Sequence, residues 1–427
     1  MSDARDDEFR RGWRVIAASL FGLMFSQATI HSGTLGVLTP ELSRVFGWSR
    51  SQIQASFAVL VLSAMLSAPI AGALVNRFGP RRVLLISIPL LSLTFMAFAL
   101  VQGSITQFYV TAAVSACLGA GTLPMAYAKV VTTWFPKRTG AALAVAMLGP
   151  GLLATFSIPA VMWIVATFGW RAVYISVGAM PMVMYPIVWI WLKEQPLASR
   201  HDVRAANVVG DSLVQALKQW RLWVMGVAFM LSSFAIAGCL TNLPTLLAEA
   251  GLKRGEIMLV SPALGGCALV GRLIGGRMLD RWWAPAVALI FMVLLAGGLA
   301  VLGNAALTPM LAAMALGLIG FSSGVENDLL AYMVSRYFGM RAYGSVYGTL
   351  FMFSGVGGGL SPVIFNLARE ATGSFQVVLY ACCAIIALTG LALLTLGRYR
   401  HFVGQAAAEP ELATAPAYLA PLEGGGR

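Results

Sequence analysis

Charged residues are scarce in this chain. Only 11% of its 427 residues are Asp, Glu, Lys or Arg, whereas 59% are hydrophobic. A soluble domain carries about a quarter charged residues, which it needs to cover its surface with groups that water can solvate. The composition therefore excludes an ordinary soluble protein and indicates an integral membrane protein.

Histidine and cysteine are also scarce, with three and five copies. The cysteines all fall in apolar stretches, and none has metal-ligand spacing with a histidine. No nucleophile triad is apparent, and no glycine-rich loop has the strand–turn–helix setting that phosphate binding requires. We therefore expect no enzyme activity, no metal site and no cofactor, and we expect the cysteines to pack as small apolar side chains.

Long apolar runs recur along the whole chain. A helix that crosses a bilayer needs about 20 apolar residues. Charged or Pro/Gly-rich breaks separate twelve such runs, at residues 15–37, 52–75, 83–101, 107–133, 140–165, 172–192, 222–247, 257–279, 284–303, 308–335, 343–368 and 375–397. The predicted fold class is therefore an all-α integral membrane protein with 12 transmembrane helices.

The net charge of +12 is distributed as a membrane topology requires. With the N-terminus inside, 21 of the 29 Lys and Arg residues fall on the cytoplasmic side and six outside, while Lys129 and Arg272 lie within the membrane. Cytoplasmic loops carry the excess of basic residues in membrane proteins. We expect a multi-pass protein of the cell inner or plasma membrane with both termini cytoplasmic, and no nucleic-acid partner.

The chain repeats itself with an offset of about 204 residues. Two prolines recur: Pro40 as Pro244 and Pro159 as Pro362. The set Gly72, Asn76 and Arg77 recurs as Gly276, Asp280 and Arg281. The set Phe135, Arg138 and Gly140 recurs as Phe338, Arg341 and Gly344. The expected domains are two pseudo-symmetric six-helix halves at 1–192 and 222–397, a cytoplasmic linker at 193–221 and a disordered cytoplasmic tail at 398–427. In carriers built from repeats, the substrate sits near the midplane between the repeats.

A motif follows the second apolar run. It reads Gly72-Ala-Leu-Val-Asn76-Arg77-Phe-Gly79-Pro-Arg81-Arg82 and resembles the Gly-x-x-x-Asp-Arg-x-Gly-x-Arg loop of the major facilitator superfamily. The second half carries the partial copy Gly276-Arg277-Met-Leu-Asp280-Arg281. Because this loop is a cytoplasmic latch in the superfamily, the resemblance implies gating by Gly72, Asn76, Arg77, Gly79, Arg81, Gly276, Asp280 and Arg281. Asn76 replaces the usual acid, which removes one charge pair from the first latch.

Further stretches resemble the monocarboxylate transporter family within that superfamily. They are Gly12-Trp13, Leu74-Val75-Asn76-Arg77-Phe78-Gly79, and Trp134-Phe135-Pro136-Lys137-Arg138-Thr139-Gly140. The resemblance extends over residues 12 to about 397. It implies two halves that rock around a central site, and a carrier of small organic anions coupled to a proton.

Ionisable residues inside a bilayer are functional candidates because each costs roughly 2.5–3.5 kcal/mol at the helix centre. Arg272 is one, and its side chain is expected to lean toward the midplane. A planar guanidinium can hold a carboxylate bidentately, and the resemblance also implies that Arg272 binds the substrate carboxylate. The alternative is an arginine neutralised by Glu326 or Asp328 for packing.

Two acids are candidates for proton coupling. The resemblance implies an aspartate one turn before the arginine, where this chain has Ala268. Glu326 or Asp328, near the same depth in the same half, is expected to take that role. They lie two residues apart, roughly 200° around a helix, so only one should face the pathway. The alternative is a permanent ion pair that stabilises one conformation.

His31 is the only histidine within an expected span. When this chain is aligned with the monocarboxylate transporter family from Gly12-Trp13, His31 falls at the position where the resemblance implies a substrate-binding lysine. We expect its side chain to face Arg272 from the opposite half, where an imidazole could bind substrate or accept the proton. The alternative is a core histidine that bonds a backbone carbonyl.

Three further residues complete the candidates. Lys129 is expected to reach the cytoplasmic surface along its flexible stem rather than to contact substrate. Tyr127 and Tyr332 occupy comparable places in the two halves and are candidates for lining the cavity.

The predicted function is secondary active transport of a monocarboxylate such as lactate or pyruvate with a proton, by alternating access. The expected partners are a small carboxylate, a proton and the lipid bilayer, and the protein is expected to be a monomer. The alternatives are a dicarboxylate exchanger or an exporter of drugs or aromatic acids on the same fold, and a receptor or channel that carries no substrate.

Overall fold

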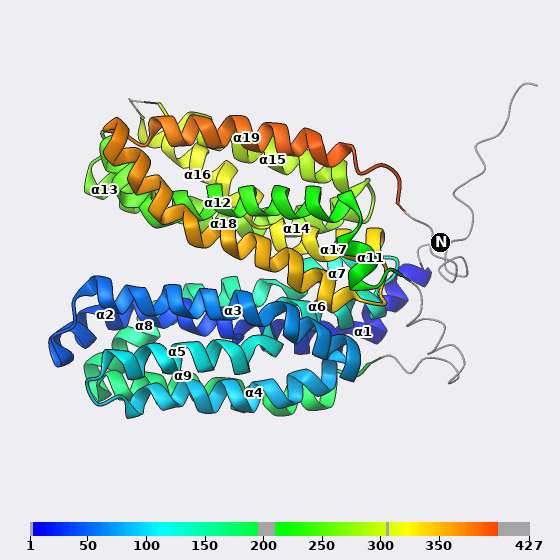
Figure 1. The fold of residues 1–427 in the computed structure, drawn as a ribbon, viewed down its shortest axis with the longest axis horizontal. Coiled ribbons are helices and arrows are strands. Elements are labelled where there is room, and N and C mark those ends of the chain that lie inside the picture. The colour runs from blue at the N-terminus through cyan, green and yellow to red at the C-terminus, as the bar shows by residue number, and fades with distance from the viewer. Residues whose placement is uncertain (1–2, 195–209, 305–306, 400–427) are drawn as a thin grey trace, which may run out of the picture.

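The computed structural model describes residues 3–194, 210–304 and 307–399. Within these ranges the regular structure is helical, apart from one bridge between Gly210 and Gly339. The helices form two bundles that lie against each other (Figure 1). Residues 195–209 of the expected linker and 400–427 of the expected tail lie outside the described residues.

The first bundle holds the helices that precede the linker. They are α1 (Asp3–Met24), α2 (Gln27–Phe46), α3 (Arg50–Phe78), α4 (Pro80–Met96), η1 (Ala97–Leu100), α5 (Ile105–Gly119), η2 (Ala120–Thr122), α6 (Pro124–Trp134), α7 (Thr139–Ala146), α8 (Leu148–Phe168) and α9 (Trp170–Trp191).

The second bundle holds the helices that follow the linker. They are α12 (Trp220–Glu249), α13 (Arg254–Val260), α14 (Pro262–Leu279), α15 (Ala284–Leu302), α16 (Pro309–Ser323), α17 (Glu326–Phe338), α18 (Tyr343–Thr372) and α19 (Gln376–Leu394), preceded by the short α11 (Leu213–Leu217) of the linker.

Among the described residues, eleven helical segments are long and apolar enough to cross a membrane. They correspond to eleven of the twelve expected crossings. The remaining crossing, expected at 140–165, is formed by α7 and α8, whose described apolar part is the shorter stretch Thr139–Leu153. The all-α membrane fold is therefore confirmed.

Several crossings that the sequence predicted as single helices are interrupted. The interruptions separate α1 from α2, α5 from α6, α7 from α8, α13 from α14 and α16 from α17. Pro150 explains one of them: proline has no N–H, so it cannot donate to the carbonyl of Ala146 four residues earlier. Each interruption leaves backbone groups without their helical partners.

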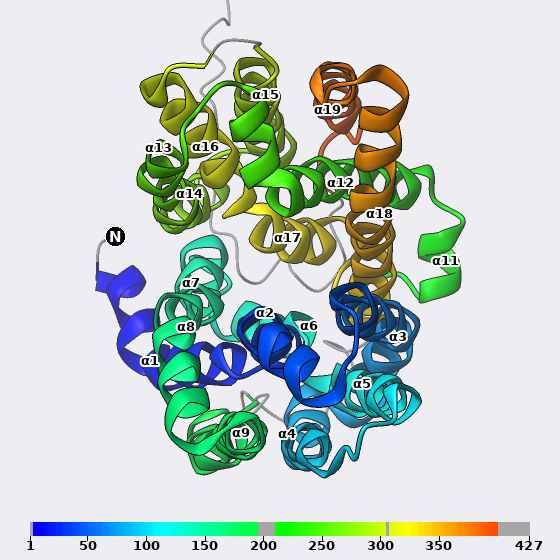
Figure 2. The ribbon, with the colours of Figure 1, turned by 90° about the vertical axis from the view of Figure 1, so that its left-hand side faces the viewer.

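The two bundles contact each other at one end of the molecule, which we call the closed end. There, α3 packs on the start of α18 and α7 packs on the end of α14 (Figures 1 and 2). Gly72 and Gly344 approach so closely that a side chain on either would overlap the other's backbone, and the same holds for Gly140 and Gly276.

The other end of the molecule differs. On α14, the positions of Gly265 and Gly266 have open space beside them, as does Gly359 on α18, among the residues that the structure describes. On these two helices, the glycines at the closed end therefore pack between the halves, whereas those near the opposite end do not.

The outer surface of the bundles is apolar. Leu66 on α3, Ile86 on α4 and Leu388 on α19 each expose more than 60% of their area. Soluble monomers rarely expose large contiguous apolar patches. A bilayer accounts for this surface because lipid tails solvate these side chains.

Candidate functional site

A polar cluster lies where α16 gives way to α17. Helix α16 ends at Ser323, Gly324 and Val325 follow, and α17 begins at Glu326. Glu326 and Asp328 therefore occupy the first turn of a helix, where the exposed N–H groups and the helix dipole favour negative charge. The break positions both acids, and the sequence analysis had drawn this crossing as continuous.

Arg272 of α14 lies next to this break. Its side chain is largely buried, and its Nε donates to the carbonyl of Gly324 at 2.8 Å. Nε also lies 3.5 Å from Oδ2 of Asp328, within ion-pair distance. Arg272 is thus not turned out to the lipid headgroups, and it has the acid neighbour that the alternative reading named.

The guanidinium of Arg272 also reaches the first half. Its Nη1 donates to the carbonyl of Met147, the residue that separates α7 from α8. The two carbonyls on Arg272, those of Met147 and Gly324, are both C-caps of interrupted helices. Cations are favoured at such ends because the last carbonyls lack helical donors.

The two acids point toward different helices. Oδ1 and Oδ2 of Asp328 are completely buried and accept no hydrogen bond from the described residues. Glu326 instead accepts a short hydrogen bond from the hydroxyl of Ser233 on α12. Asp328 is therefore the acid that faces Arg272, as expected for two positions on opposite sides of a helix.

Tyr347 belongs to the same neighbourhood, and the sequence analysis missed it. This residue of α18 is fully buried, and its hydroxyl has no hydrogen-bond partner among the described residues. Asp328, Glu326 and Arg272 all lie within electrostatic range of the phenol. A polar aromatic residue inside an expected crossing was the only sequence signal for it, and tyrosines are common there.

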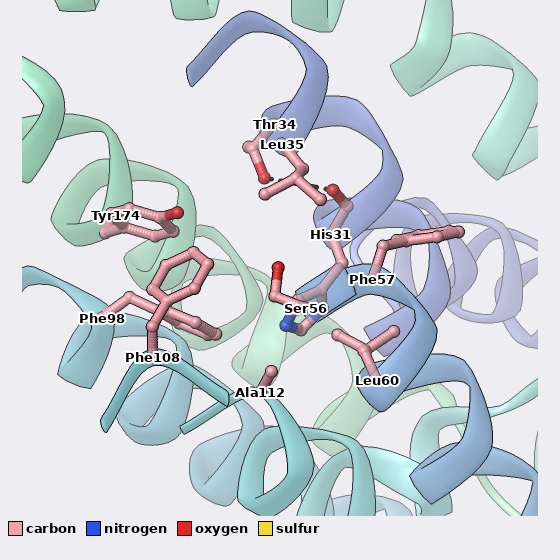
Figure 3. A pocket seen from close by; sticks show the side chains of 10 residues that line it. All are labelled: His31, Thr34, Leu35, Ser56, Phe57, Leu60, Phe98, Phe108, Ala112 and Tyr174. Carbon is pink, nitrogen blue, oxygen red and sulfur yellow. Dashed lines mark hydrogen bonds between the residues drawn. The ribbon is translucent and has the colours of Figure 1, made fainter. Parts of the chain in front are cut away.

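His31 lies inside the first half. Figure 3 shows its imidazole beside a small cavity that Ser56, Thr34 and Tyr174 also line. The free volume of about 20 Å³ accommodates one water molecule. Nδ1 lies 2.8 Å from the carbonyl of Gln27, which can only accept, so Nδ1 carries the proton of that bond.

The surroundings of His31 differ from those expected. Phe95 and Phe98 pack edge-on against the imidazole, with ring centroids 4.9 and 5.9 Å away. All its recorded neighbours belong to the first half, so the side chain does not face Arg272 in this conformation. Nε2 is buried and has no partner among the described residues. The imidazole therefore bonds a backbone carbonyl through one nitrogen and keeps the other free.

Tyr127 and Tyr332 are both buried in their own halves. The ring and hydroxyl of Tyr127 fill the space beside Gly22 of α1, and the hydroxyl has no hydrogen-bond partner among the residues described. The guanidinium of Arg336 lies 5.2 Å above the ring of Tyr332. The structure does not bring either tyrosine to Arg272.

The first latch is a hydrogen-bond contact between the halves, made by Asn76 at the end of α3. Its Oδ1 accepts from the N–H of Gly344 at 2.9 Å, and its Nδ2 donates to the hydroxyl of Ser345 at 2.9 Å. Gly344 and Ser345 lie in the first turn of α18, where backbone N–H groups need acceptors. A neutral amide thus does here what the superfamily pattern assigns to an acid.

The second latch is the equivalent contact of the repeat, made by a charged group that accepts both of its bonds. The carboxylate of Asp280, at the end of α14, accepts from the N–H groups of Gly140 at 2.6 Å and Ala141 at 2.9 Å. Both amides lie in the first turn of α7. Burial raises the pKa of the Asp280 carboxyl above its ordinary value, although these two N–H groups act in the opposite direction.

Lys129 corrects an expectation. It does not extend to the surface: its side chain is buried, and Nζ donates to Oδ1 of Asn76 at 3.1 Å and to the carbonyl of Val75 at 3.5 Å. The carbonyl oxygens at the end of α3 lack helical donors and draw the ammonium inward. Lys129 is therefore part of the first latch, which the sequence analysis had treated as weakened.

The remaining latch residues shape the turn or lie at its edge. Gly79 has φ +86°, a conformation that favours glycine. Arg81 donates from Nη2 to the carbonyl of Trp189 at 2.9 Å, which ties the turn to α9. Arg77 lies over the ring of Phe78 at 5.3 Å, and Arg281 is exposed.

Known proteins resemble this chain along most of its length. The sequence profile described as Major Facilitator Superfamily matches residues 18–362. Monocarboxylate transporter 11 of Mus musculus is 25% identical, with 88% of this chain and 85% of that protein aligned. A probable sulfoacetate transporter, SauU, of Cupriavidus necator is also 25% identical, over 87% and 91%.

The fold is similar to that of solved carriers. The Escherichia coli fucose:proton symporter FucP superposes with a TM-score of 0.70 at 14% identity, covering 90% of this chain and 98% of that one. At this identity the likeness shows the shared fold.

Proposed function

This chain belongs to the Major Facilitator Superfamily, and we propose that it carries a small organic anion, most simply a monocarboxylate such as lactate or pyruvate, together with a proton. Its relatives support the substrate class, because their names include a monocarboxylate transporter and a probable sulfoacetate transporter. Monocarboxylates and sulfoacetate are all small organic anions that carry a carboxylate, and sulfoacetate carries a sulfonate as well.

Arg272 carries this proposal. It is a buried guanidinium between the two halves, held by neutral carbonyls from Met147 and Gly324 and beside a single carboxylate, Asp328. Its Nη2 donates to no described residue. A carboxylate can accept from two N–H groups of one guanidinium, and this charge-assisted contact is roughly twice as strong as one between neutral groups. The substrate anion is thus proposed to bind through the outer nitrogens of Arg272.

Asp328 is the proposed proton carrier. A buried carboxylate that accepts no hydrogen bond is costly when charged, and the cation of Arg272, together with the positive end of the α17 dipole, offsets that cost. When a substrate anion neutralises Arg272, Asp328 loses its counter-ion and should take up a proton. Glu326 is the less suited acid because Ser233 already donates to it.

His31 is proposed to act on the proton rather than on the substrate in this conformation. Its free Nε2 beside the small cavity of Figure 3 supports this role, because the lone pair of that nitrogen can accept a proton. Tyr127 and Tyr332 remain proposed cavity residues only for conformations in which the halves have moved.

The two latches are proposed to gate the closed end, which we place in the cytoplasm because most Lys and Arg residues lie on that side. The conformation is then outward-facing. Opening the cytoplasmic end requires the bonds of Asn76 and Asp280 to break, and closing the other end requires the halves to meet there, which is alternating access.

A dianion exchanger is disfavoured by the same geometry. Two carboxylates would need two strong cations facing one site. Neither His31 nor Lys129 lies beside Arg272, and Lys129 bonds Asn76 instead. An exporter of drugs or aromatic acids is the remaining alternative, and it predicts that expression confers resistance to its substrate.

Uptake into proteoliposomes tests the proposal. Labelled lactate should accumulate faster when the lumen is alkaline, and Arg272→Ala should abolish uptake in protein that still elutes as a folded species. Arg277→Ala is the matched control, because that arginine lies on the same helix, is exposed and bonds only the carbonyl of Leu273. Normal uptake by Arg272→Ala would remove this residue from the mechanism.

A further inference from the structure

One guanidinium joins the ends of two interrupted helices from opposite halves. Met147 caps the C-terminal end of α7 in the first half, and Gly324 caps that of α16 in the second. Arg272, on α14 of the second half, donates to both carbonyls, through Nη1 and Nε respectively. Arg272 is therefore itself a contact between the halves, in addition to being the proposed anion site.

This contact lies at the opposite end of α7 from the bonds of the second latch. Gly140 and Ala141, bonded by Asp280, are at the first turn of α7, whereas Met147 is at its last. Helix α7 is thus held to the second half at both of its ends. At the first of these ends, Gly140 and Gly276 also pack backbone against backbone. Losing the Met147 bond would leave α7 with hydrogen bonds to the second half at its first turn only, beside its packing on α14.

The acceptor from the first half is a neutral carbonyl. A carboxylate is a stronger acceptor for the same N–H group, because the bond is then between two charges. A ligand shifts a conformational equilibrium only through contacts that differ between the two states. An anion that binds Arg272 in place of Met147 supplies such a difference, since it removes a bond that exists only while α7 is docked.

We propose that a substrate carboxylate and the carbonyl of Met147 compete for the guanidinium of Arg272, so that anion binding itself releases α7 from the second half. This inference rests on the proposed function, in which Arg272 is the carboxylate site. In the empty carrier, Arg272 holds the closed end together. In the loaded carrier, the two latches and the packing of α3 on α18 and of α7 on α14 hold it without Arg272, and the closed end opens more readily.

Hydrogen–deuterium exchange measured by mass spectrometry tests the contact without any ligand. Amide exchange reports local opening, and peptides covering 139–147 report on α7. Arg272→Gln alone would strand the charge of Asp328, so the informative comparison is Arg272→Gln/Asp328→Asn against Asp328→Asn. Loss of a hydrogen bond with a charged donor should speed exchange of α7 by about tenfold or more. Peptides of α4, which does not touch Arg272, should exchange as before.

The same measurement with lactate tests the competition. Saturating lactate on the wild-type protein should raise the exchange of 139–147 toward that of the double variant and leave α4 unchanged. Unchanged α7 exchange in the ligand-free double variant would overturn the contact, whether or not lactate is transported.

The two proposals fail in different ways. If lactate raises the melting temperature and so binds, but α7 exchange stays constant or falls, the competition is wrong and the proposed function stands. If neither lactate nor pyruvate alters the melting temperature or drives uptake, the proposed function is wrong, and the competition falls with it. The ligand-free comparison of variants would still decide the contact between Arg272 and Met147.

Discussion

Asn76 and Asp280, 204 positions apart in the chain, each bond the first turn of a helix in the opposite half. Asn76 holds Gly344 and Ser345 of α18, and Asp280 holds Gly140 and Ala141 of α7. Gly140 and Gly344, like Ala141 and Ser345, are separated by the same offset, so one contact has been built twice, although Asn76 reaches Ser345 by donating to its hydroxyl. The copies differ in charge: the second is an anion, and the first is a neutral amide beside the ammonium of Lys129.

Restoring the acid at the first latch should strengthen it. In Asn76→Asp, a carboxylate faces both the first turn of α18 and Lys129, and bonds to charged groups exceed neutral ones by about 1 kcal/mol. Exchange of peptides covering 343–350 should slow by about fivefold, and lactate uptake should slow because the closed end opens less often. Asp280→Glu, which keeps the charge of the second latch, is the control. Unchanged exchange of peptides 343–350 in Asn76→Asp would show that the side chain at position 76 does not limit the opening of α18.

Replacing Lys129 should not unfold the protein. Its buried ammonium bonds two neutral carbonyl groups, and the carboxylate that acts on it, that of Glu194, is exposed and also accepts from the N–H of Arg81. Lys129→Met therefore strands no buried charge and removes the cost of burying a cation. We expect the melting temperature of the variant in detergent to be equal or higher. We also expect faster exchange at 343–350, since Asn76 loses a donor that orients its amide. A fall of many degrees would mean that the ammonium is essential to the fold.

The second latch should make stability depend on pH. Because burial raises the pKa of Asp280 in the folded protein, the folded state holds this proton more tightly than the unfolded state does. Stability from this group is therefore present at low pH and falls as pH rises from the ordinary value of 3.8 through the raised value. Asp280→Asn should flatten the dependence of melting temperature on pH in that window. Identical slopes for the two proteins would refute the assignment.

Variants of the two acids of α17 should behave differently in transport assays. Asp328→Asn should lose the stimulation of uptake by a pH gradient yet still exchange labelled for unlabelled lactate, because an amide cannot carry the proton. Glu326→Gln should keep the stimulation, since Ser233 can still donate to the remaining carbonyl oxygen. The reverse pattern would assign the proton to Glu326, and loss in both variants would indicate that the pair acts together.

The fold could be predicted from the sequence because the signals for it are local. Apolar runs, basic ends and the repeat of Gly72, Asn76 and Arg77 at Gly276, Asp280 and Arg281 follow from what a bilayer requires of each segment on its own. The same reasoning found the scarce ionisable groups within the membrane, including Arg272 and Asp328, because each is conspicuous in an apolar stretch.

Tertiary structure decided what those groups touch. The acceptors of Arg272 are main-chain carbonyls that interrupted helices leave free, and no side chain in the sequence marks them. His31 bonds a carbonyl of its own helix and packs against Phe95 and Phe98 of the first half, and Lys129 turned inward because the end of α3 offered it a carbonyl acceptor. Depth in the membrane can be read along one segment, whereas the direction of a side chain and the partner it meets depend on helices far away in the chain.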